Sequence, residues 1–271
     1  MIPDIDNKYS AEIGIIGGTG IYDADIFCDR KDIKVYTPYG DASDLITIGN
    51  YSGKKLAFIA RHGQSHRLPP HKINYRANIW ALKKLGVTRI IAPSVVGSMR
   101  PEYRPGDLAI PDQFFDFTKR REYTFFDGGQ ICHISVADPF CPELRSLTID
   151  CANKLNYGIH HTANYICIEG PRFSTRAESR FFRDFVGADI IGMTLVPECS
   201  LAREAQICYA SVAIITDYDV WANTPVSTKE VIETLTNSAQ KAKRLIAQLI
   251  PLIPLKRSVC GCGNALEGSM L

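Results

Sequence analysis

The sequence predicts an α/β protein with one domain, in which a twisted, mostly parallel or mixed central sheet is flanked by helices. Short apolar runs alternate with longer amphipathic stretches, which is the pattern of strands and helices in such a sheet. The 271 residues are 45% hydrophobic and contain no internal repeat, low-complexity segment or Pro/Gly-rich linker, so one large core is expected. We place that core in residues 10–250 of a single domain, 1–271, and assign residues 251–271 to a C-terminal tail.

The expected strands are short apolar runs, several of them apolar enough for burial on both faces of the sheet. They cover residues 13–16, 55–60, 87–96, 165–168, 189–192 and 208–216. Amphipathic stretches predict helices over residues 74–85, 175–185, 197–206 and 227–250. Gly86 ends the first of these helices, and Ser227 with Glu230 has the spacing of a capping box at the start of the last. Residues 114–140 are aromatic and irregular, so we expect a long excursion there.

Charge and hydropathy argue against several classes of partner. The net charge of +2 gives no reason to expect binding to nucleic acid or to an anionic membrane. No run of about 18 apolar residues is present, and the nearest stretch, residues 245–255, is interrupted by Gln248, Pro251 and Pro254. Acidic residues occupy the N-terminal segment, where a signal peptide carries basic ones. We therefore expect a soluble, cytoplasmic protein with no membrane or nucleic-acid partner.

Each expected strand is followed by a short cluster of glycine and polar residues. Ligands of open α/β sheets bind outside the carboxyl ends of the strands, so these clusters are expected to converge on one site. The clusters are Gly17–Gly20, Arg61–His66, Ser94–Ser98, Glu169–Ser174, Gly192–Thr194 and Thr216–Asp219.

The first two clusters indicate an anion site. The run Gly18-Thr19-Gly20 does not continue as a dinucleotide fingerprint, because Asp23 occupies the position of the third glycine. Glycines let backbone N–H groups approach an oxyanion, and Thr19 adds a hydroxyl donor. Arg61 and His62 add a guanidinium, which suits phosphate, and an imidazole. A tight turn without a ligand is the alternative for the glycine run.

Asp217 and Asp219 flank Tyr218 at the end of the last expected strand. Two carboxyl groups can accept hydrogen bonds from an exocyclic amine and carry a proton to a ring nitrogen. A purine leaves more easily as a neutral base than as an anion, so a carboxylic acid near N7 favours its departure. A simple helix cap is the alternative for this turn.

Six motifs resemble those of the 5′-methylthioadenosine phosphorylases, which are trimeric purine nucleoside phosphorylases. The resemblance runs in order over residues 12–250, and heat-adapted archaeal members are especially similar. The motifs are Ile13–Gly20, Arg61–Gly63, Asn74–Leu82, Glu169–Ser174, Met193–Glu198 and Thr216–Asp219.

The resemblance implies a role for each site residue. Phosphate would be bound by Thr19, Arg61, His62, Ser94, the backbone of Val95, and Thr194. The nucleoside would be bound by Met193 beneath the ribose, by Phe173 against the base, and by Ser174, Asp217 and Asp219 along the base edge. His66 would border the 5′-methylthio group, and His133 of a neighbouring subunit would complete that pocket. The assembly implied is a homotrimer or a dimer of trimers.

The resemblance also implies the reaction. Phosphate would attack C1′ while adenine leaves, giving 5-methylthioribose 1-phosphate without a metal or organic cofactor. Asp217 is expected to carry a proton to N7, and Asp219 to contact the 6-amino group. The reverse assignment stays open. Carboxylates suit the amine of adenine better than the carbonyl of a 6-oxopurine. A phosphorylase that also accepts adenosine, inosine or guanosine is the alternative, followed by a hydrolytic nucleosidase and a non-catalytic nucleoside-binding protein.

Nine cysteines are many for a cytoplasmic enzyme, and their spacing indicates no metal site. Heat-adapted members of the family are similar in carrying disulfides and a C-terminal Cys-x-Cys, which Cys260-Gly261-Cys262 matches. The resemblance therefore implies at least two intrachain disulfides. The candidate pairs are Cys141 with Cys208, and Cys199 with Cys260 or Cys262.

Overall fold

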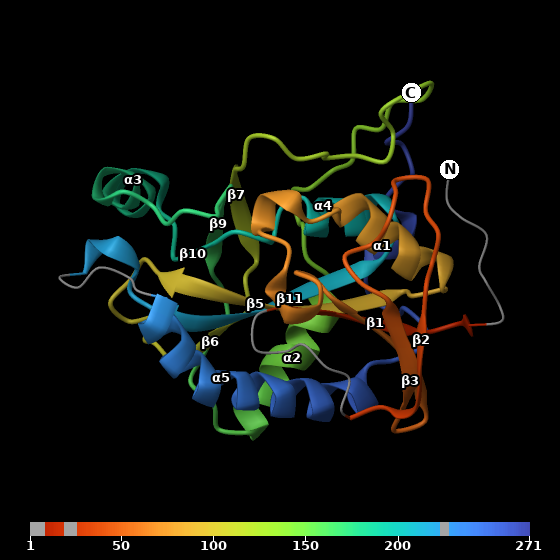
Figure 1. The fold of residues 1–271 in the computed structure, drawn as a ribbon, viewed down its shortest axis with the longest axis horizontal. Helices are drawn as coiled ribbons and strands as arrows, with labels where there is room; N and C mark the ends of the chain where they lie inside the picture. The colour runs from red at the N-terminus through yellow and green to blue at the C-terminus, as the bar shows by residue number, and fades with distance from the viewer. Residues whose placement is uncertain (1–8, 19–25, 223–227) are drawn as a thin grey trace.

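The computed structural model describes residues 9–18, 26–222 and 228–271, and in them eleven strands form one mixed sheet (Figure 1). The sheet is the expected α/β fold, and its strands span most of the chain. They are β1 Ile13–Gly17, β2 Cys28–Ile33, β3 Ile46–Tyr51, β4 Lys54–Ala60, β5 Arg89–Ser98, β6 Leu108–Ala109, β7 Gln113–Phe117, β8 Ile159–His160, β9 Asn164–Ile168, β10 Ile190–Gly192 and β11 Cys208–Asp217.

The strand order is β2-β3-β4-β1-β5-β10-β9-β7, and β11 pairs with both β5 and β6, which in turn pairs with β8. Six of the pairings are parallel and four are antiparallel, so the sheet is mixed with a parallel majority, as predicted. The longest pairing joins β5 to β11 in parallel, from Cys208 opposite Arg89 to Asp217 opposite Gly97. This strand pair therefore has two separate ends: Arg89 and Cys208 lie at the amino end, and Gly97 and Asp217 lie at the carboxyl end.

Helices cover both faces of the sheet (Figure 1). The first face carries α1 (Tyr75–Lys84) and α4 (Glu198–Glu204), and the second carries α2 (Pro142–Lys154) and α5 (Thr228–Leu249). Because side chains alternate along a strand, β11 contributes to both cores. Its first-face residues are Tyr209, Ala213 and Ile215, and its second-face residues are Cys208, Ala210, Val212 and Ile214.

The structure differs from the sequence prediction at the sheet edges. The segment predicted as an excursion begins with the strand β7, which pairs with β9 in parallel, and only the residues after it are irregular. This strand and β2 lie at the two ends of the strand order, and both are mostly exposed. β2 lacks the apolar pattern of a buried strand, whereas β7 contains three phenylalanines that do not alternate with polar residues.

The position of the capping box also differs from the prediction. The capping box expected at Ser227 lies outside the described residues. A capping box is instead formed at the start of α3 (Arg176–Phe181), where Thr175 and Glu178 exchange side-chain-to-backbone hydrogen bonds. No helix in the described ranges is long and apolar enough to cross a membrane.

The predicted disulfides are not formed, since all nine cysteines are unbonded in the structure. Cys141 and Cys208 do lie together, as predicted. The predicted pairing of Cys199 with a tail cysteine is wrong: Cys199 packs in the first-face core, whereas Cys262 packs in the second. The sheet separates the two.

Candidate active site

A pocket of about 620 Å³ opens where the predicted polar clusters converge at the strand ends. It brings together eleven of the thirteen residues predicted to bind phosphate or nucleoside. They are Arg61, His62, His66, Ser94, Val95, Phe173, Ser174, Met193, Thr194, Asp217 and Asp219. The topology explains the convergence, because β4, β5 and β11 run in one direction through the centre of the sheet and release their chains at the same edge.

Arg61 follows β4 and is 1% exposed. Its guanidinium donates through Nε and Nη2 to the two carboxylate oxygens of Glu198, at 2.6 and 2.8 Å, and through Nη1 to the carbonyl of Pro93 at 2.9 Å. Burial disfavours the charge, but the Glu198 carboxylate outweighs it and raises the pKa of Arg61. The pocket therefore holds a fixed cation that is already oriented before any ligand arrives.

His62 is fixed in one tautomer. Its Nδ1 lies 2.9 Å from the carbonyl oxygen of Leu68, which can only accept, so Nδ1 carries the proton and donates. Burial lowers the pKa of His62 to about 3, so the imidazole is neutral near pH 7 and its Nε2 is an acceptor. His66 stacks on His62 with ring centroids 4.1 Å apart. The stack places His66 at the rim of the pocket.

Asp217 and Asp219 are buried at the end of β11. Asp217 accepts from the Thr216 hydroxyl at 2.8 Å and from the Asp219 backbone N–H at 2.9 Å. Asp219 accepts from the Ser179 hydroxyl at 2.5 Å, and burial raises the pKa of its carboxyl group. The pair thus combines a carboxylate held by two donors with a neighbour that takes up a proton more readily than an ordinary aspartate.

Apolar and hydroxyl groups line the remaining wall. Phe173 is 42% exposed and contributes a ring face, while Met193 contributes a thioether after β10. The Ser174 hydroxyl is buried and has no hydrogen-bond partner among the described residues. A buried hydroxyl of this kind in a pocket is ready to bind a ligand.

Two glycines allow close approach of backbone to the polar groups. A Cβ at Gly18 would lie 2.8 Å from Arg61 Nη1, and a Cβ at Gly97 would lie 2.8 Å from Asp217 Oδ1. Any side chain at these positions would displace the guanidinium or the carboxylate. The glycines of the first and third clusters therefore have a steric reason that the sequence alone does not reveal.

Sequence reasoning missed the residues that support the pocket. The Tyr209 hydroxyl donates to Glu198 at 2.7 Å, so it helps to hold the carboxylate that orients Arg61. Arg121, from the irregular segment, donates to Tyr75 at 3.2 Å and to the Glu169 carbonyl at 2.8 Å, which fixes the chain end after β9. Burial of a polar or charged side chain is what marks these residues as important. The sequence does not show that burial, because it depends on the fold.

Two predicted residues are not in the described pocket. Thr19 lies outside the described residues. His133 is exposed, and its backbone N–H donates to the Ser269 carbonyl at 2.8 Å, in a part of the chain that does not line the pocket.

Comparison with known proteins places the chain in a family. The family model of the phosphorylase superfamily matches residues 12–251. The S-methyl-5′-thioadenosine phosphorylase of Nitrosopumilus maritimus is 58% identical and covers 94% of this chain and 97% of its own. That of Saccharolobus solfataricus is 56% identical, covering 98% of this chain and all of its own length.

Solved structures agree with these relatives. A methylthioadenosine phosphorylase from an Antarctic soil metagenomic library is 44% identical, covers 97% of this chain and 93% of its own, and superimposes with a TM-score of 0.91. The methylthioadenosine phosphorylase of Schistosoma mansoni in complex with adenine is 36% identical, with coverage of 92% and 93% and a TM-score of 0.88. The chain therefore belongs to the phosphorylase superfamily and, within it, to the S-methyl-5′-thioadenosine phosphorylases.

Proposed function

We propose that this protein is a pentosyltransferase that splits 5′-methylthioadenosine with inorganic phosphate, giving adenine and 5-methylthioribose 1-phosphate for purine and methionine salvage. One observation carries the proposal: a buried, oriented arginine and a pair of buried carboxyl groups line the same pocket. The first suits an anionic nucleophile, and the second suits a purine leaving group. The proposal is supported by the relatives from Nitrosopumilus maritimus and Saccharolobus solfataricus, which are both S-methyl-5′-thioadenosine phosphorylases.

Phosphate is assigned to the Arg61 end. Nη1 and Nη2 of Arg61 each keep one N–H beyond those used by Glu198 and Pro93. Ser94, Val95 and Thr194 line the same pocket, and phosphate is assigned to the two hydroxyls and to the Val95 backbone. Neutral His62 accepts through Nε2, so it is suited to the hydroxyl of hydrogen phosphate rather than to a bare oxyanion. Holding phosphate beside C1′ lowers the barrier by orientation alone, and the chemistry needs no metal or organic cofactor.

The purine is assigned to the Asp217 end. Phe173 packs on the ring, the unpartnered Ser174 hydroxyl meets the base edge, and Met193 lies under the ribose. Asp217 is assigned to N7 and Asp219 to the 6-amino group. As the C1′–N9 bond breaks, its electrons move to the base, the protonated Asp217 carboxyl group gives its proton to N7 and becomes a carboxylate, and a phosphate oxygen bonds to C1′.

The 5′ group is assigned to His66 at the rim, together with His133 of a neighbouring copy in a homotrimer or a dimer of trimers. An apolar 5′ substituent favours neutral surroundings, and burial lowers the pKa of His66. Sedimentation analysis gives the oligomer. His133→Ala is expected to raise KM for methylthioadenosine several-fold with little change in kcat.

The proposed activity is tested by adenine release from methylthioadenosine, adenosine and inosine, each with and without phosphate. The expected result is release only with phosphate, with the highest kcat/KM for methylthioadenosine. Faster cleavage of inosine would assign the site to 6-oxopurine nucleosides, and release without phosphate would make the protein a nucleosidase. Tight binding without release would make it a binding protein.

A further inference from the structure

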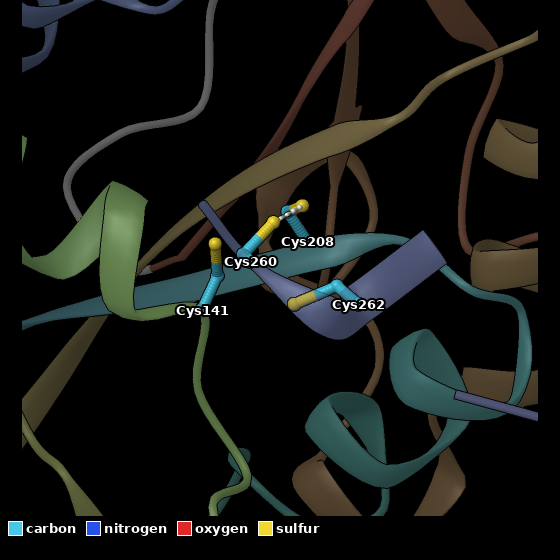
Figure 2. A group of neighbouring side chains, drawn as sticks. All are labelled: Cys141, Cys208, Cys260 and Cys262. Carbon is cyan, nitrogen blue, oxygen red and sulfur yellow. Dashed lines mark hydrogen bonds between the residues drawn. The ribbon is translucent and has the colours of Figure 1, made fainter. Parts of the chain in front are cut away.

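Four cysteine side chains meet at the amino ends of β5 and β11, at the opposite end of this strand pair from the pocket (Figure 2). Cys141 precedes α2, Cys208 begins β11, and Cys260 and Cys262 come from the tail. Their four Sγ atoms all lie within 4.8 Å of one another, and Cys208 and Cys260 are 3.4 Å apart. Three segments far apart in the sequence thus deliver four sulfurs to one point.

The cluster is held in place from several sides. The Cys141 backbone N–H donates to the Tyr209 carbonyl at 2.9 Å, which fixes the start of α2 against β11. Arg89 Nη2 donates to the carbonyls of Pro254 and Lys256 at 3.2 and 3.1 Å and so fastens the tail. Cys141, Cys208 and Cys262 are buried, and Cys260 is half-buried. The sulfurs are therefore preorganised by main-chain contacts.

We propose that Cys141, Cys208, Cys260 and Cys262 form a structural zinc site. Structural zinc binds four thiolates tetrahedrally at about 2.3 Å, which sets the sulfurs about 3.8 Å apart. The observed spacing brackets that value, so shifts of less than about 1 Å complete the shell. All four sulfurs are mutual neighbours, as a tetrahedral ion requires, whereas two disulfides need only two separate pairs. Soft thiolates favour zinc over magnesium or calcium.

The surrounding charges suit such a site. Four thiolates around a divalent ion carry a net charge of −2, and the buried guanidinium of Arg89 donates to Cys208 Sγ at 2.9 Å. A donor to a ligating sulfur orients it and offsets part of this charge. Glu143 is also near, at 3.9 Å from Cys260 Sγ, but its charge is paired with Arg89 at 3.0 Å and it accepts from Ser258 at 2.8 Å.

The inference is tested on the full chain without an affinity tag, isolated under nitrogen with no added reductant. Zinc is counted by elemental mass spectrometry, and thiols are counted after denaturation with a chelator. The expected result is about one zinc per chain with nine free thiols. Replacing zinc by Co²⁺ is expected to give the visible bands of a tetrahedral thiolate complex.

Single variants identify the ligands. Cys260→Ser and Cys262→Ser change only the tail, and each is expected to lower zinc affinity by more than the ~10–100-fold that loss of an outer-shell partner costs. Cys28→Ser, in an exposed strand, is the matched control and keeps the zinc of the parent. Circular dichroism checks that each variant is folded.

Three results overturn the inference. One is a reduced chain whose nine thiols are free and which takes up no Zn²⁺ or Co²⁺ on titration. Another is a chain isolated with these four cysteines joined in two disulfides, whether or not they include the pair of Cys141 with Cys208 that the family resemblance implies. Equal zinc content in Cys28→Ser and Cys262→Ser also rejects this set of ligands.

Discussion

Two buried arginine–glutamate pairs lie in different parts of the same sheet, and they are used differently. Arg61 pairs with Glu198 beside the pocket. Arg89 pairs with Glu143 at the thiol cluster of Cys141, Cys208, Cys260 and Cys262. Both arginines are 1% exposed. Arg61 gives two of its donors to one carboxylate and lines a cavity, whereas Arg89 spreads its donors over a sulfur, a carboxylate and two tail carbonyls.

The difference shows that burial of a charge does not identify function by itself. Arg61 is held rigidly with donors left over at an open space, so a ligand can use them. Arg89 Nε has no partner among the described residues, but Arg89 does not line the active-site pocket, and its other donors fasten the tail to β5 and β11. We infer that the first pair serves binding and the second serves stability.

The largest effect is expected from Arg61→Met. Loss of the oriented cation is expected to lower kcat/KM for phosphate at least ~10²–10³-fold. It also leaves Glu198 buried without its partner, which costs about 3–5 kcal/mol of unfolding free energy. Adenine release and urea denaturation measure the two effects.

A triple variant separates these two losses. Arg61→Met with Glu198→Leu and Tyr209→Phe removes every polar member of the group, so most of the stability is expected to return while activity stays low. Recovery of activity together with stability would show that Arg61 acts only through the fold.

The second largest effect is expected from Arg89→Met. Breaking this buried pair is expected to cost about 3–5 kcal/mol of unfolding free energy, with a change in kcat/KM below about tenfold in protein that remains folded. The same two measurements apply. A loss of activity as large as that of Arg61→Met, at equal folded fraction, would contradict the division between the two pairs.

Much of the pocket could be predicted because strand ends are visible in a sequence. Arg61 and Asp217 directly follow apolar runs, and Ser94 lies two residues before the end of the predicted strand over residues 87–96. Parallel strands end at the same edge of a sheet, so these residues are expected to lie close together. The edge strand β2 could not be predicted, because its exposed residues lack an apolar pattern. β7 was missed for another reason: its three phenylalanines do not alternate with polar residues and run into the irregular aromatic segment.

The supporting groups could not be predicted for a different reason. Glu198 contacts Arg61 across 137 residues of sequence, and the thiol cluster joins positions 141, 208, 260 and 262, which have no metal-binding spacing. Such contacts depend on strand order and on where the tail docks. The local pattern of residues in the sequence shows neither the strand order nor the place where the tail docks.

A smaller effect, on pH dependence, is expected at the pocket. His62 has a pKa lowered by burial to about 3, so between about 3 and the ordinary value of 6.5 the unfolded chain binds a proton that the folded chain does not. The contribution of neutral His62 is therefore complete above pH 6.5 and is lost as the pH falls toward 3. Between pH 7 and 5 it lowers the unfolding free energy by about 1–2 kcal/mol.

The pH prediction is tested by urea denaturation at pH 7 and pH 5. His62→Asn is expected to reduce the difference in unfolding free energy between the two pH values, whereas Arg89→Met is expected to leave it unchanged. An equal pH difference in His62→Asn and the parent would mean that His62 is not held neutral by the fold.

The smallest effect is expected for an exposed ion pair. Lys34 lies 3.0 Å from Asp41, and their side chains are 50% and 76% exposed. Water and salt screen such a pair, so Lys34→Met is expected to leave the urea midpoint and the activity within experimental error. A clear loss of stability would show that distance, and not burial, decides the contribution of ion pairs in this protein.

The central claim is that phosphate, and not water, takes the place of the base at C1′ in the pocket around Arg61. Phosphorus-31 NMR of a reaction with methylthioadenosine and phosphate tests it directly. The account predicts a sugar 1-phosphate resonance that grows in equal amount with released adenine and is absent with Arg61→Met. Released adenine with only the inorganic phosphate resonance, and free methylthioribose as the product, would contradict it.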